Sequence, residues 1–183
     1  MKKVTIIAIV GMPGAGKSVA AEFFHSKNIS ILRFGDQTDI GLKEYHLEKN
    51  EKNERWYREK LRNEFGMAAM AVKIHPRIEE QKKTHDTIVL DGLYSWEEYL
   101  YLHEKYPTLR LLCIYASPKI RQERLQIRAV RPLTSQEAKS RDIAEIQNLN
   151  KGGPIAIADY LIKNEGDEEE FTAELSEYYS TIV

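Results

Sequence analysis

Residues 11–18 read Gly11-Met12-Pro13-Gly14-Ala15-Gly16-Lys17-Ser18. This stretch satisfies G-x-x-x-x-G-K-[ST], the pattern of a phosphate-binding P-loop. Residues 4–10 before it form an unbroken apolar and β-branched run, typical of a strand buried on both faces. Residues 19–24 after it are compatible with a helix. A strand, a glycine-rich turn and a helix N-terminus direct consecutive backbone N–H groups at one anion, so all eight residues are predicted to bind a nucleoside triphosphate.

Three side chains are predicted to act on the triphosphate and its metal. Lys17 is expected to reach the β- and γ-phosphates of ATP, and the Ser18 hydroxyl is expected to bind Mg²⁺. Asp91 follows the apolar run 87–90, where the carboxyl end of a parallel strand would face the P-loop, so it is a second predicted Mg²⁺ ligand. The alternative for Asp91 and Gly92 is a plain turn after a strand.

The residues around these motifs argue against two classes of nucleotide-hydrolysing enzyme. Glycine follows Asp91, whereas ATPases of the motor type usually place a glutamate there to activate water. The sequence contains neither N-K-x-D nor D-x-x-G, the motifs expected of a GTPase. Phosphoryl transfer to another molecule is therefore favoured over hydrolysis.

Length and charge restrict the classes further. The 183 residues are expected to form a single domain, 1–183, with a substantial core. The net charge of −1 provides no general attraction to nucleic acid or to an anionic membrane, so neither is expected as a partner. The single cysteine, Cys113, lies in an apolar run and is expected to be a buried structural thiol. We expect a cytoplasmic protein with a small-molecule partner, and the sequence leaves its oligomeric state open.

Five apolar runs alternate with helical stretches along the chain. The runs are residues 4–10, 29–34, 87–90, 110–116 and 160–163. This alternation predicts an α/β P-loop fold: a five-stranded parallel sheet of order 2-3-1-4-5, with helices on both faces. Capping-box patterns at residues 95–98 and 134–137 predict two of the helix starts.

A strongly basic segment lies between the fourth and fifth apolar runs. From Lys119 to Arg141 there are seven basic side chains and two acidic ones. Arg121, Arg124 and Arg128 have the spacing of one helix face, and Arg141 follows after a loop. Phosphoryl transfer spreads negative charge over the migrating group, so Arg124, Arg128 and Arg141 are predicted catalytic residues on a mobile flap. A solvated basic helix is the alternative.

The long segment between the second and third runs, residues 36–83, is predicted to form a lobe of two or three helices. Its apolar stripe consists of Leu61, Phe65, Ala68 and Val72. Arg58 and Arg62 flank the stripe and are predicted to bind a second anion, with solvated surface charge as the alternative. Asp36 directly follows the second run and is predicted either to contact the acceptor or to cap a helix.

Together these motifs resemble the P-loop kinase group that includes nucleoside monophosphate kinases, and more closely the adenylate-kinase-related proteins of archaea. The matching pieces are residues 11–18, Gly35-Asp36, 66–68, Asp91-Gly92, Arg124 with Arg128, Arg141-Asp142 and 158–166. From Gln122 onward the chain is also similar to dephospho-CoA kinases. The resemblance implies an acceptor-binding lobe at 36–83, a lid at 121–141 and an adenine site near the turn 164–166, with Asn164 as a nucleotide ligand.

The chain departs from adenylate kinases at two positions where they carry arginines, which are Asp39 and Ser95 here. Arg58 and Arg62 would then have to bind the acceptor. We therefore predict a kinase that moves the γ-phosphate of Mg-ATP to a small nucleotide-like acceptor, most simply a nucleoside or deoxynucleoside monophosphate. The alternatives are a hydroxyl kinase resembling dephospho-CoA kinase, in which Asp36 would serve as the base, and a non-catalytic ATP-binding switch.

Overall fold

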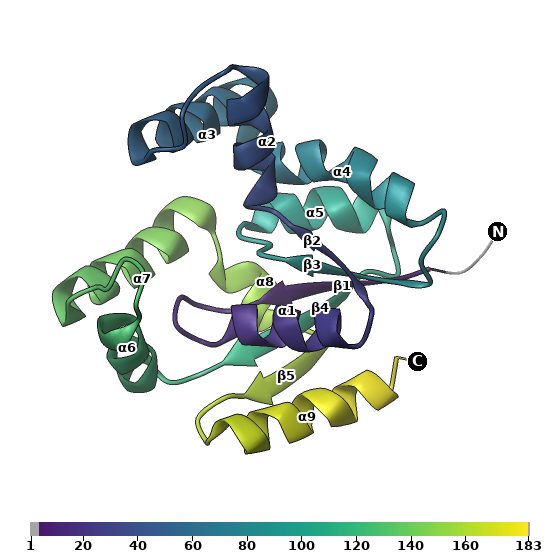
Figure 1. Cartoon of the computed structure of the whole chain (residues 1–183), viewed down its shortest axis with the longest axis vertical. Coiled ribbons are helices and arrows are strands. Elements are labelled where there is room, and N and C mark those ends of the chain that lie inside the picture. Colours follow the sequence, from purple (N-terminus) through teal and green to yellow (C-terminus); the bar gives the residue numbers. More distant parts are fainter. Residues whose placement is uncertain (1–3, 183) are drawn as a thin grey trace.

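The central sheet has five parallel strands. The computed structural model describes residues 4–182, so both ends of the predicted domain 1–183 lie outside the described residues. The strands are β1 (Thr5–Val10), β2 (Ser30–Arg33), β3 (Thr87–Asp91), β4 (Arg110–Tyr115) and β5 (Tyr160–Lys163). Their order is β2-β3-β1-β4-β5 and every neighbouring pair is parallel, as Figure 1 shows. The predicted fold and strand order are confirmed.

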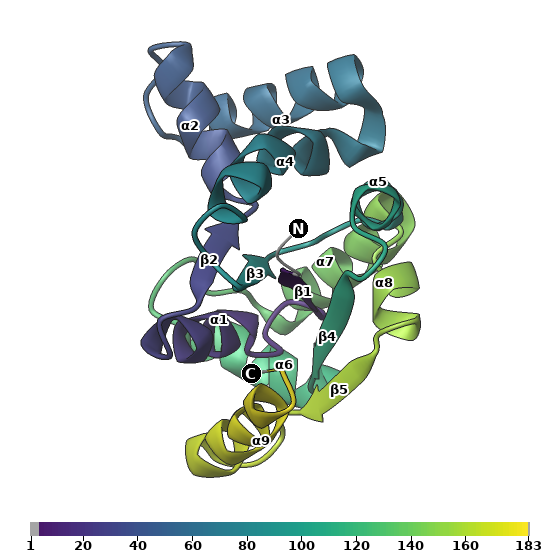
Figure 2. The same cartoon turned by 90° about the vertical axis from the view of Figure 1, so that its right-hand side faces the viewer.

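Helices cover both faces of this sheet. On one face, α1 (Lys17–Ser26) and α9 (Glu168–Ser180) bury Phe24 and Leu175 against the strands. On the other, α4 (Ala69–Gln81) and α5 (Trp96–Lys105) pack Ile74 and Leu102 on the same sheet (Figure 2). Such two-sided burial explains the continuous apolar runs of the strands. In the described part of the chain, no helix is long and apolar enough to cross a membrane.

The sole cysteine, Cys113, lies inside the core formed by the second face of the sheet. Its side chain is almost completely buried. Burial raises the pKa of the Cys113 thiol to about 11, which leaves it protonated and unreactive at neutral pH. The expected structural role is in keeping with this environment.

The first insertion forms a lobe with a small core of its own. It contains α2 (Asp36–Glu44), α3 (Glu51–Phe65) and a short 3₁₀ helix, η1 (Gly66–Ala68). Leu42, Tyr57, Leu61 and Ala69 form its core. The predicted apolar stripe is not continuous, because Gly66 ends α3 and leaves Phe65 39% exposed. The last helix of the insertion, α4, begins in the core of the lobe with Ala69 and then packs Ile74 and Ile78 on the main sheet.

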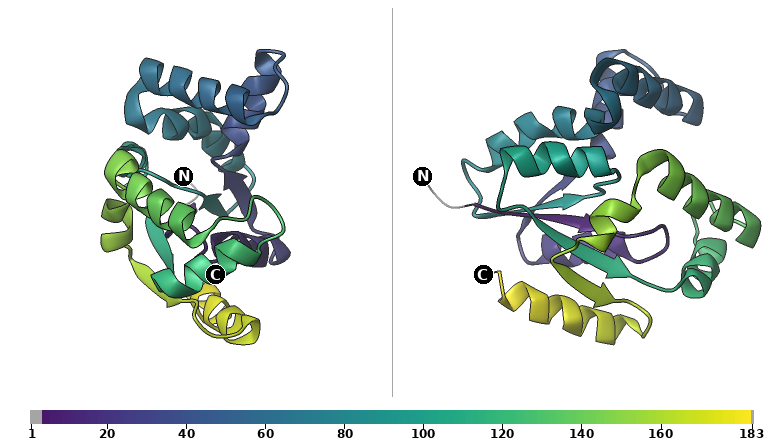
Figure 3. Two further views of the ribbon diagram at one scale, coloured as in Figure 1. Left: turned by 90° about the vertical axis from the view of Figure 1, so that its left-hand side faces the viewer. Right: turned by 180° about the vertical axis from the view of Figure 1, so that it is seen from behind.

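The second insertion contains α6 (Pro118–Ile127), α7 (Ser135–Leu149) and the short α8 (Gly152–Ala156). Both predicted capping boxes are present, at the starts of α5 and α7. The prediction that Arg128 shares a helix face with Arg121 and Arg124 is wrong, because α6 ends at Ile127 and Arg128 is extended. The lobe and the α6–α7 segment both lie at the carboxyl edge of the sheet (Figures 1 and 3).

Candidate functional site

The P-loop joins the end of β1 to the start of α1 in a conformation that requires glycine. Gly11 and Gly16 have φ angles of +142° and +106°. A Cβ atom at Gly11 would lie 2.3 Å from the Ile114 carbonyl oxygen, and one at Gly16 would lie 2.2 Å from Nδ2 of Asn164. Side chains at these positions would therefore both strain the backbone and clash with neighbours. The loop places the N-terminus of α1 at the carboxyl edge of the sheet, where a helix favours an anion.

Lys17 lies over the same loop. Its Nζ donates hydrogen bonds to the carbonyl oxygens of Gly11, at 2.8 Å, and Met12, at 3.0 Å. Burial lowers the pKa of Lys17 to about 7, and the nearby charge of Lys151 acts in the same direction. The two carbonyl oxygens favour the charged ammonium in return. Since an anionic phosphate would stabilise that charge much further, the environment of Lys17 suits a ligand with negative charge.

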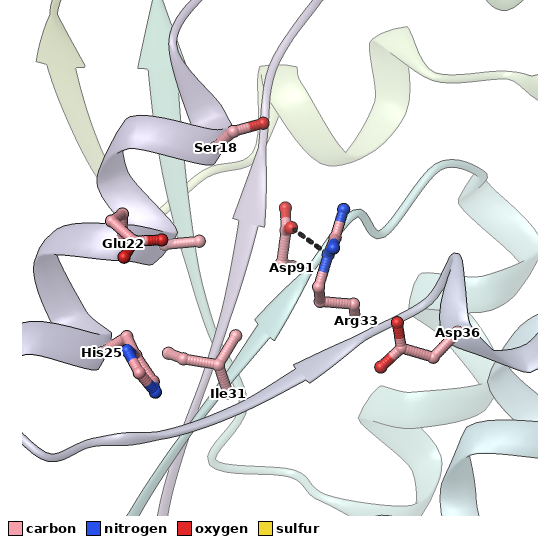
Figure 4. Close-up of a pocket in the computed structure, with 8 residues that line it drawn as sticks. Ser18, Glu22, His25, Ile31, Arg33, Asp36 and Asp91 are labelled. Atoms are coloured by element: carbon pink, nitrogen blue, oxygen red, sulfur yellow. Dashed lines mark ion pairs between the residues drawn. The ribbon is translucent and has the colours of Figure 1, made fainter.

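Ser18, Asp91 and Asp36 line one cavity of about 390 Å³, together with Arg33. We call this space the edge cavity. Figure 4 shows Ser18 on α1 facing Asp91 at the end of β3, with Arg33 beside Asp91. Burial raises the pKa of Asp91, whereas the charges of Arg33 and Lys17 oppose the rise. The site thus combines two predicted metal ligands in one space.

These two oxygen donors fit a magnesium ion bound with a nucleotide. Mg²⁺ is held in such sites by one or two protein oxygens and is otherwise coordinated by phosphate and water. A hydroxyl and a partly buried carboxylate supply that donor set. Among residues 4–182 there is no cluster of three or more acidic, histidine or cysteine side chains that would hold a metal without a nucleotide.

Asp36 is the first residue of α2 rather than its cap. Gly35 occupies the N-cap position, and the helix has no side-chain cap, so the capping alternative for Asp36 is wrong. The Asp36 Oδ2 atom lies 3.4 Å from Nη2 of Arg77, which reaches across from α4. The Gln37 side-chain oxygen also accepts from Arg77 once its amide is oriented to satisfy both neighbours. Arg77 belongs to no motif, so this contact cannot be predicted from the sequence.

The two lobe arginines predicted to bind the acceptor lie apart from the edge cavity lining. Arg58 on α3 contacts Glu54 one turn away, at 3.4 Å. Arg131, from the lid, approaches the same Glu54 carboxylate at 4.0 Å. Arg62 is exposed. Neither Arg58 nor Arg62 is among the residues that line the edge cavity.

Asn164, which directly follows β5, contacts the P-loop, and Arg124 contacts Asn164. The Asn164 side chain donates from Nδ2 to the Ala15 carbonyl oxygen at 2.8 Å. Arg124 on α6 donates to the backbone oxygen of Asn164 at 3.0 Å and to its Oδ1 at 3.2 Å. Asn164 is thereby connected directly to the P-loop, and Arg124 is connected to the loop through Asn164.

Arg121 connects α6 to the P-loop and to α7. It is 5% exposed and forms a bidentate ion pair with Asp142 on α7, at 2.8 and 2.7 Å. The same guanidinium donates to the Pro13 carbonyl oxygen at 3.0 Å. A bidentate contact of this kind is among the stronger side-chain interactions, so α6 and α7 are fixed to each other next to the P-loop.

Arg141 takes part in a buried charge network that the sequence did not reveal. Its Nε donates to Oε1 of Glu145 at 3.0 Å, and Lys151 donates to the other oxygen of Glu145. Lys151 is only 1% exposed, and its Nζ lies 4.8 Å from the centre of the Tyr94 ring. Arg128 instead donates to the Arg131 backbone at 2.6 Å. A buried lysine that follows a helix looks from sequence like an ordinary charged loop residue.

Glu98, in the capping box of α5, is a buried acid next to the site. It accepts hydrogen bonds from the backbone nitrogens of Tyr94, at 2.7 Å, and Ser95, at 3.2 Å. Burial nevertheless raises the pKa of Glu98 from 4.5 to about 7. Because the folded protein holds this proton more tightly than the unfolded chain, Glu98 makes stability fall as pH rises from 4.5 to about 7.

Glu98→Gln is expected to remove this dependence, since an amide oxygen can still accept from the same backbone nitrogens. The free energy of unfolding of Glu98→Gln minus that of wild type should therefore increase by up to about 3 kcal/mol when the pH is raised from about 5 to about 8. Urea unfolding of both proteins at both pH values measures this difference in free energy. The matched control is Glu137→Gln, in the exposed capping box of α7, which should show no such gain. Equal pH dependence in wild type and Glu98→Gln would contradict the raised pKa.

The strand order and the P-loop together define a protein with a P-loop fold of the kinase-like type. Residues 7–146 match the family AAA_18, described as an AAA domain. The UPF0200 protein MJ1399 of Methanocaldococcus jannaschii is 34% identical over 180 residues, covering 97% of this chain and 90% of that protein. The UPF0200 protein PYRAB09750 of Pyrococcus abyssi is 30% identical over 174 residues, covering 93% and 92%. The chain belongs to the UPF0200 family.

Solved structures with the same fold include small-molecule kinases. TT1252 from Thermus thermophilus has a TM-score of 0.67 at 19% identity and full coverage of both chains. A shikimate kinase from Bacteroides thetaiotaomicron has a TM-score of 0.62 at 13% identity, covering 97% of each chain. A gluconokinase from Sinorhizobium meliloti has a TM-score of 0.55 at 15% identity, covering 99% of this chain and 97% of that one. At these identities the likeness shows the fold, and the specific resemblances to nucleoside monophosphate kinases and dephospho-CoA kinases stay predictions.

Proposed function

We propose that this protein is an ATP-dependent phosphotransferase that moves the γ-phosphate of Mg-ATP to a small nucleotide-like acceptor. The observation that carries the proposal is the arrangement of charged and polar side chains at the carboxyl edge of the sheet. Lys17 lies over the P-loop, and Ser18, Asp91 and Asp36 line the adjacent edge cavity. A hydrolase would need a group that activates water, and glycine follows Asp91 where motor-type ATPases place a glutamate. Transfer to a bound acceptor needs positioning and charge stabilisation instead.

Each proposed residue has a separate task. The P-loop backbone and Lys17 bind the phosphates, and Ser18 and Asp91 hold Mg²⁺, which neutralises phosphate charge when bound. Arg124 keeps Asn164 against the loop, and Asn164 contributes to the nucleotide site. Arg128 and Arg141 supply positive charge from the lid. Arg141 uses Nε for Glu145, so its Nη groups are the donors we expect to contact the transferring phosphoryl.

The acceptor group divides the proposal into two versions. A phosphate acceptor, as in a nucleoside or deoxynucleoside monophosphate, is already ionised at neutral pH and needs no base. A hydroxyl acceptor must lose a proton, and the position of Asp36 on the edge cavity supports this second version. We favour the phosphate acceptor, because two arginines lie beside the carboxylates at this edge: Arg33 contacts Asp91 and Arg77 contacts Asp36.

Asp36→Asn distinguishes the two versions, because asparagine keeps the size of the side chain but cannot accept a proton. For a phosphate acceptor, kcat should fall roughly tenfold or less, whereas loss of a general base typically costs about 10²–10⁴-fold. Steady-state kinetics with the identified acceptor gives the answer. Asp39→Asn is the matched control, since Asp39 pairs with Lys49 at 2.7 Å outside the cavity lining. A collapse of kcat with unchanged ATP affinity would assign a hydroxyl acceptor.

A panel of acceptors tests the proposal as a whole. ADP release is measured with nucleoside and deoxynucleoside monophosphates, dephospho-CoA, shikimate and gluconate, each against a reaction without acceptor. We expect at least one member to stimulate ADP release strongly. ATP binding without stimulation by any of them would favour the alternative, a nucleotide-binding switch that reports ATP occupancy to a protein partner.

A further inference from the structure

The two arginines that accompany the carboxylates at the carboxyl edge of the sheet have no individual task among the nucleotide-binding and lid residues described so far. Arg33 is the last residue of β2 and lines the edge cavity beside Asp91 (Figure 4). Arg77 projects from α4 to the neighbouring Asp36. They come from distant parts of the chain, and each is next to one of the two carboxylates of the cavity. Their charges therefore lie beside the two carboxylates of the edge cavity, to which the proposed function assigns the metal and the acceptor.

Both arginines keep binding capacity beyond their ion pairs. Arg33 contacts Asp91 through Nε at 3.4 Å, and Arg77 contacts Asp36 through Nη2 at 3.4 Å. These are single, long contacts, whereas the buried pair of Arg121 and Asp142 is bidentate and 2.7–2.8 Å long. A guanidinium group has five N–H donors in a planar fork that suits an oxyanion. The Arg33 side chain is 66% exposed and that of Arg77 is 33% exposed, so a ligand can reach both.

Arg77 is held in place more firmly than a surface arginine. The buried Gln37 accepts a hydrogen bond from it and donates to the Lys73 backbone at 3.2 Å. Gln37 and Asp36 are neighbours at the start of α2, so the first turn of the lobe orients the guanidinium from two sides. A pre-oriented cation loses less side-chain freedom when it binds an anion.

The binding of the metal and the role of Arg33 are connected through Asp91. Ser18 and Asp91 are the proposed Mg²⁺ ligands, and the same Asp91 carboxylate pairs with Arg33. A carboxylate that coordinates Mg²⁺ is a weaker partner for an arginine, because the metal neutralises its charge. Occupation of the metal site therefore leaves the Arg33 guanidinium available for another anion.

The other two arginines predicted to bind the acceptor lie on α3, outside the lining of the edge cavity. Arg58 pairs with Glu54, and Arg62 is exposed on α3. Asp39 and Ser95, which stand where the resembling kinases carry arginines, pair with Lys49 and cap α5 respectively. We propose that Arg33 and Arg77 form the anion-binding part of the acceptor site and that they bind a phosphate or carboxylate group of the acceptor. The inference rests on the proposed function and names the residues that would recognise its second substrate.

Binding measurements test this assignment without requiring turnover. The protein is first saturated with Mg-ADP, and AMP, inorganic phosphate or acetate is then titrated in, with arginine Nε–H resonances and calorimetry as readouts. We expect AMP or inorganic phosphate to bind to wild type and to shift the Arg33 and Arg77 resonances. Binding of acetate in addition would extend the recognised group to carboxylates.

Arg33→Gln and Arg77→Gln should each weaken this second anion about tenfold or more, while Mg-ADP affinity changes by less than about twofold. Arg55→Gln is the matched control, since Arg55 also makes a single contact with a carboxylate at 3.4 Å but lies on α3 with a 76% exposed side chain. Arg77→Lys retains the charge and should recover part of the affinity, and circular dichroism checks that each variant folds.

Three results would overturn the inference, and they differ in what they leave standing. Loss of the second anion in Arg58→Gln or Arg62→Gln, with Arg33→Gln and Arg77→Gln unaffected, would move the acceptor site to α3. If no second anion binds to the Mg-ADP complex, the proposed anion-binding site of Arg33 and Arg77 is contradicted, while the nucleotide-binding role is not. Failure of wild type to bind Mg-ADP would contradict the proposed function as well.

Discussion

Lys17→Ala is expected to lower the rate of phosphoryl transfer by on the order of 10²–10³-fold or more. In the proposed reaction Lys17 is the P-loop cation that would reach the phosphates, and its charge would stabilise the transition state more than the bound substrate. The fold should remain intact, because within residues 4–182 the Lys17 ammonium donates hydrogen bonds to the Gly11 and Met12 carbonyl oxygens of its own loop rather than to another element. ADP release at saturating acceptor measures the rate, and thermal unfolding measures the fold.

Lys27→Ala provides the matched control for this experiment. Lys27 lies at the other end of α1, where its ammonium sits 5.4 Å from the centre of the Phe23 ring. Removal of that charge should leave turnover close to that of wild type. Near-normal turnover in Lys17→Ala would show that the loop has no catalytic role.

Asp91→Asn is expected to lower the transfer rate by on the order of 10²-fold and to raise the Mg²⁺ concentration needed for half-maximal rate. Asparagine keeps the shape at the end of β3 but removes the negative charge that holds the metal. A Mg²⁺ titration of the rate separates loss of the metal from loss of the fold. Asp39→Asn, outside the cavity lining, should keep the Mg²⁺ dependence of wild type. An unchanged Mg²⁺ requirement in Asp91→Asn would contradict the role of Asp91 as a metal ligand and would favour the alternative, a turn after β3 without a metal role.

The fold could be predicted because its signals are local. Each strand of the sheet is an apolar run, and the P-loop fixes which strand lies in the centre. The capping boxes at Ser95 and Thr134 were also readable, since each uses two residues three positions apart. Local patterns of this kind predict the structure well when the tertiary packing favours the same helices and strands as the local sequence.

The site was predicted less completely because its contacts join distant residues. Arg77 and Asp36 are 41 positions apart, and no spacing rule brings them together. Lys151 was missed for a similar reason, because its burial depends on the packing of α8 near Tyr94. Arg128 was misplaced because residue spacing alone cannot show that α6 ends at Ile127. The sequence therefore indicates the position of the P-loop well and the contacts of the arginines around it poorly.

The central claim, transfer rather than hydrolysis or simple binding, is tested most directly by following the γ-phosphoryl group itself. ATP with an isotopic label in the γ-phosphate is incubated with Mg²⁺, the protein and the acceptor panel, and the products are separated. We predict that the label appears on an organic acceptor, in equal amount to the ADP formed, and that Lys17→Ala abolishes it. Label that stays in ATP, or appears only as inorganic phosphate, would contradict the assignment as a phosphotransferase.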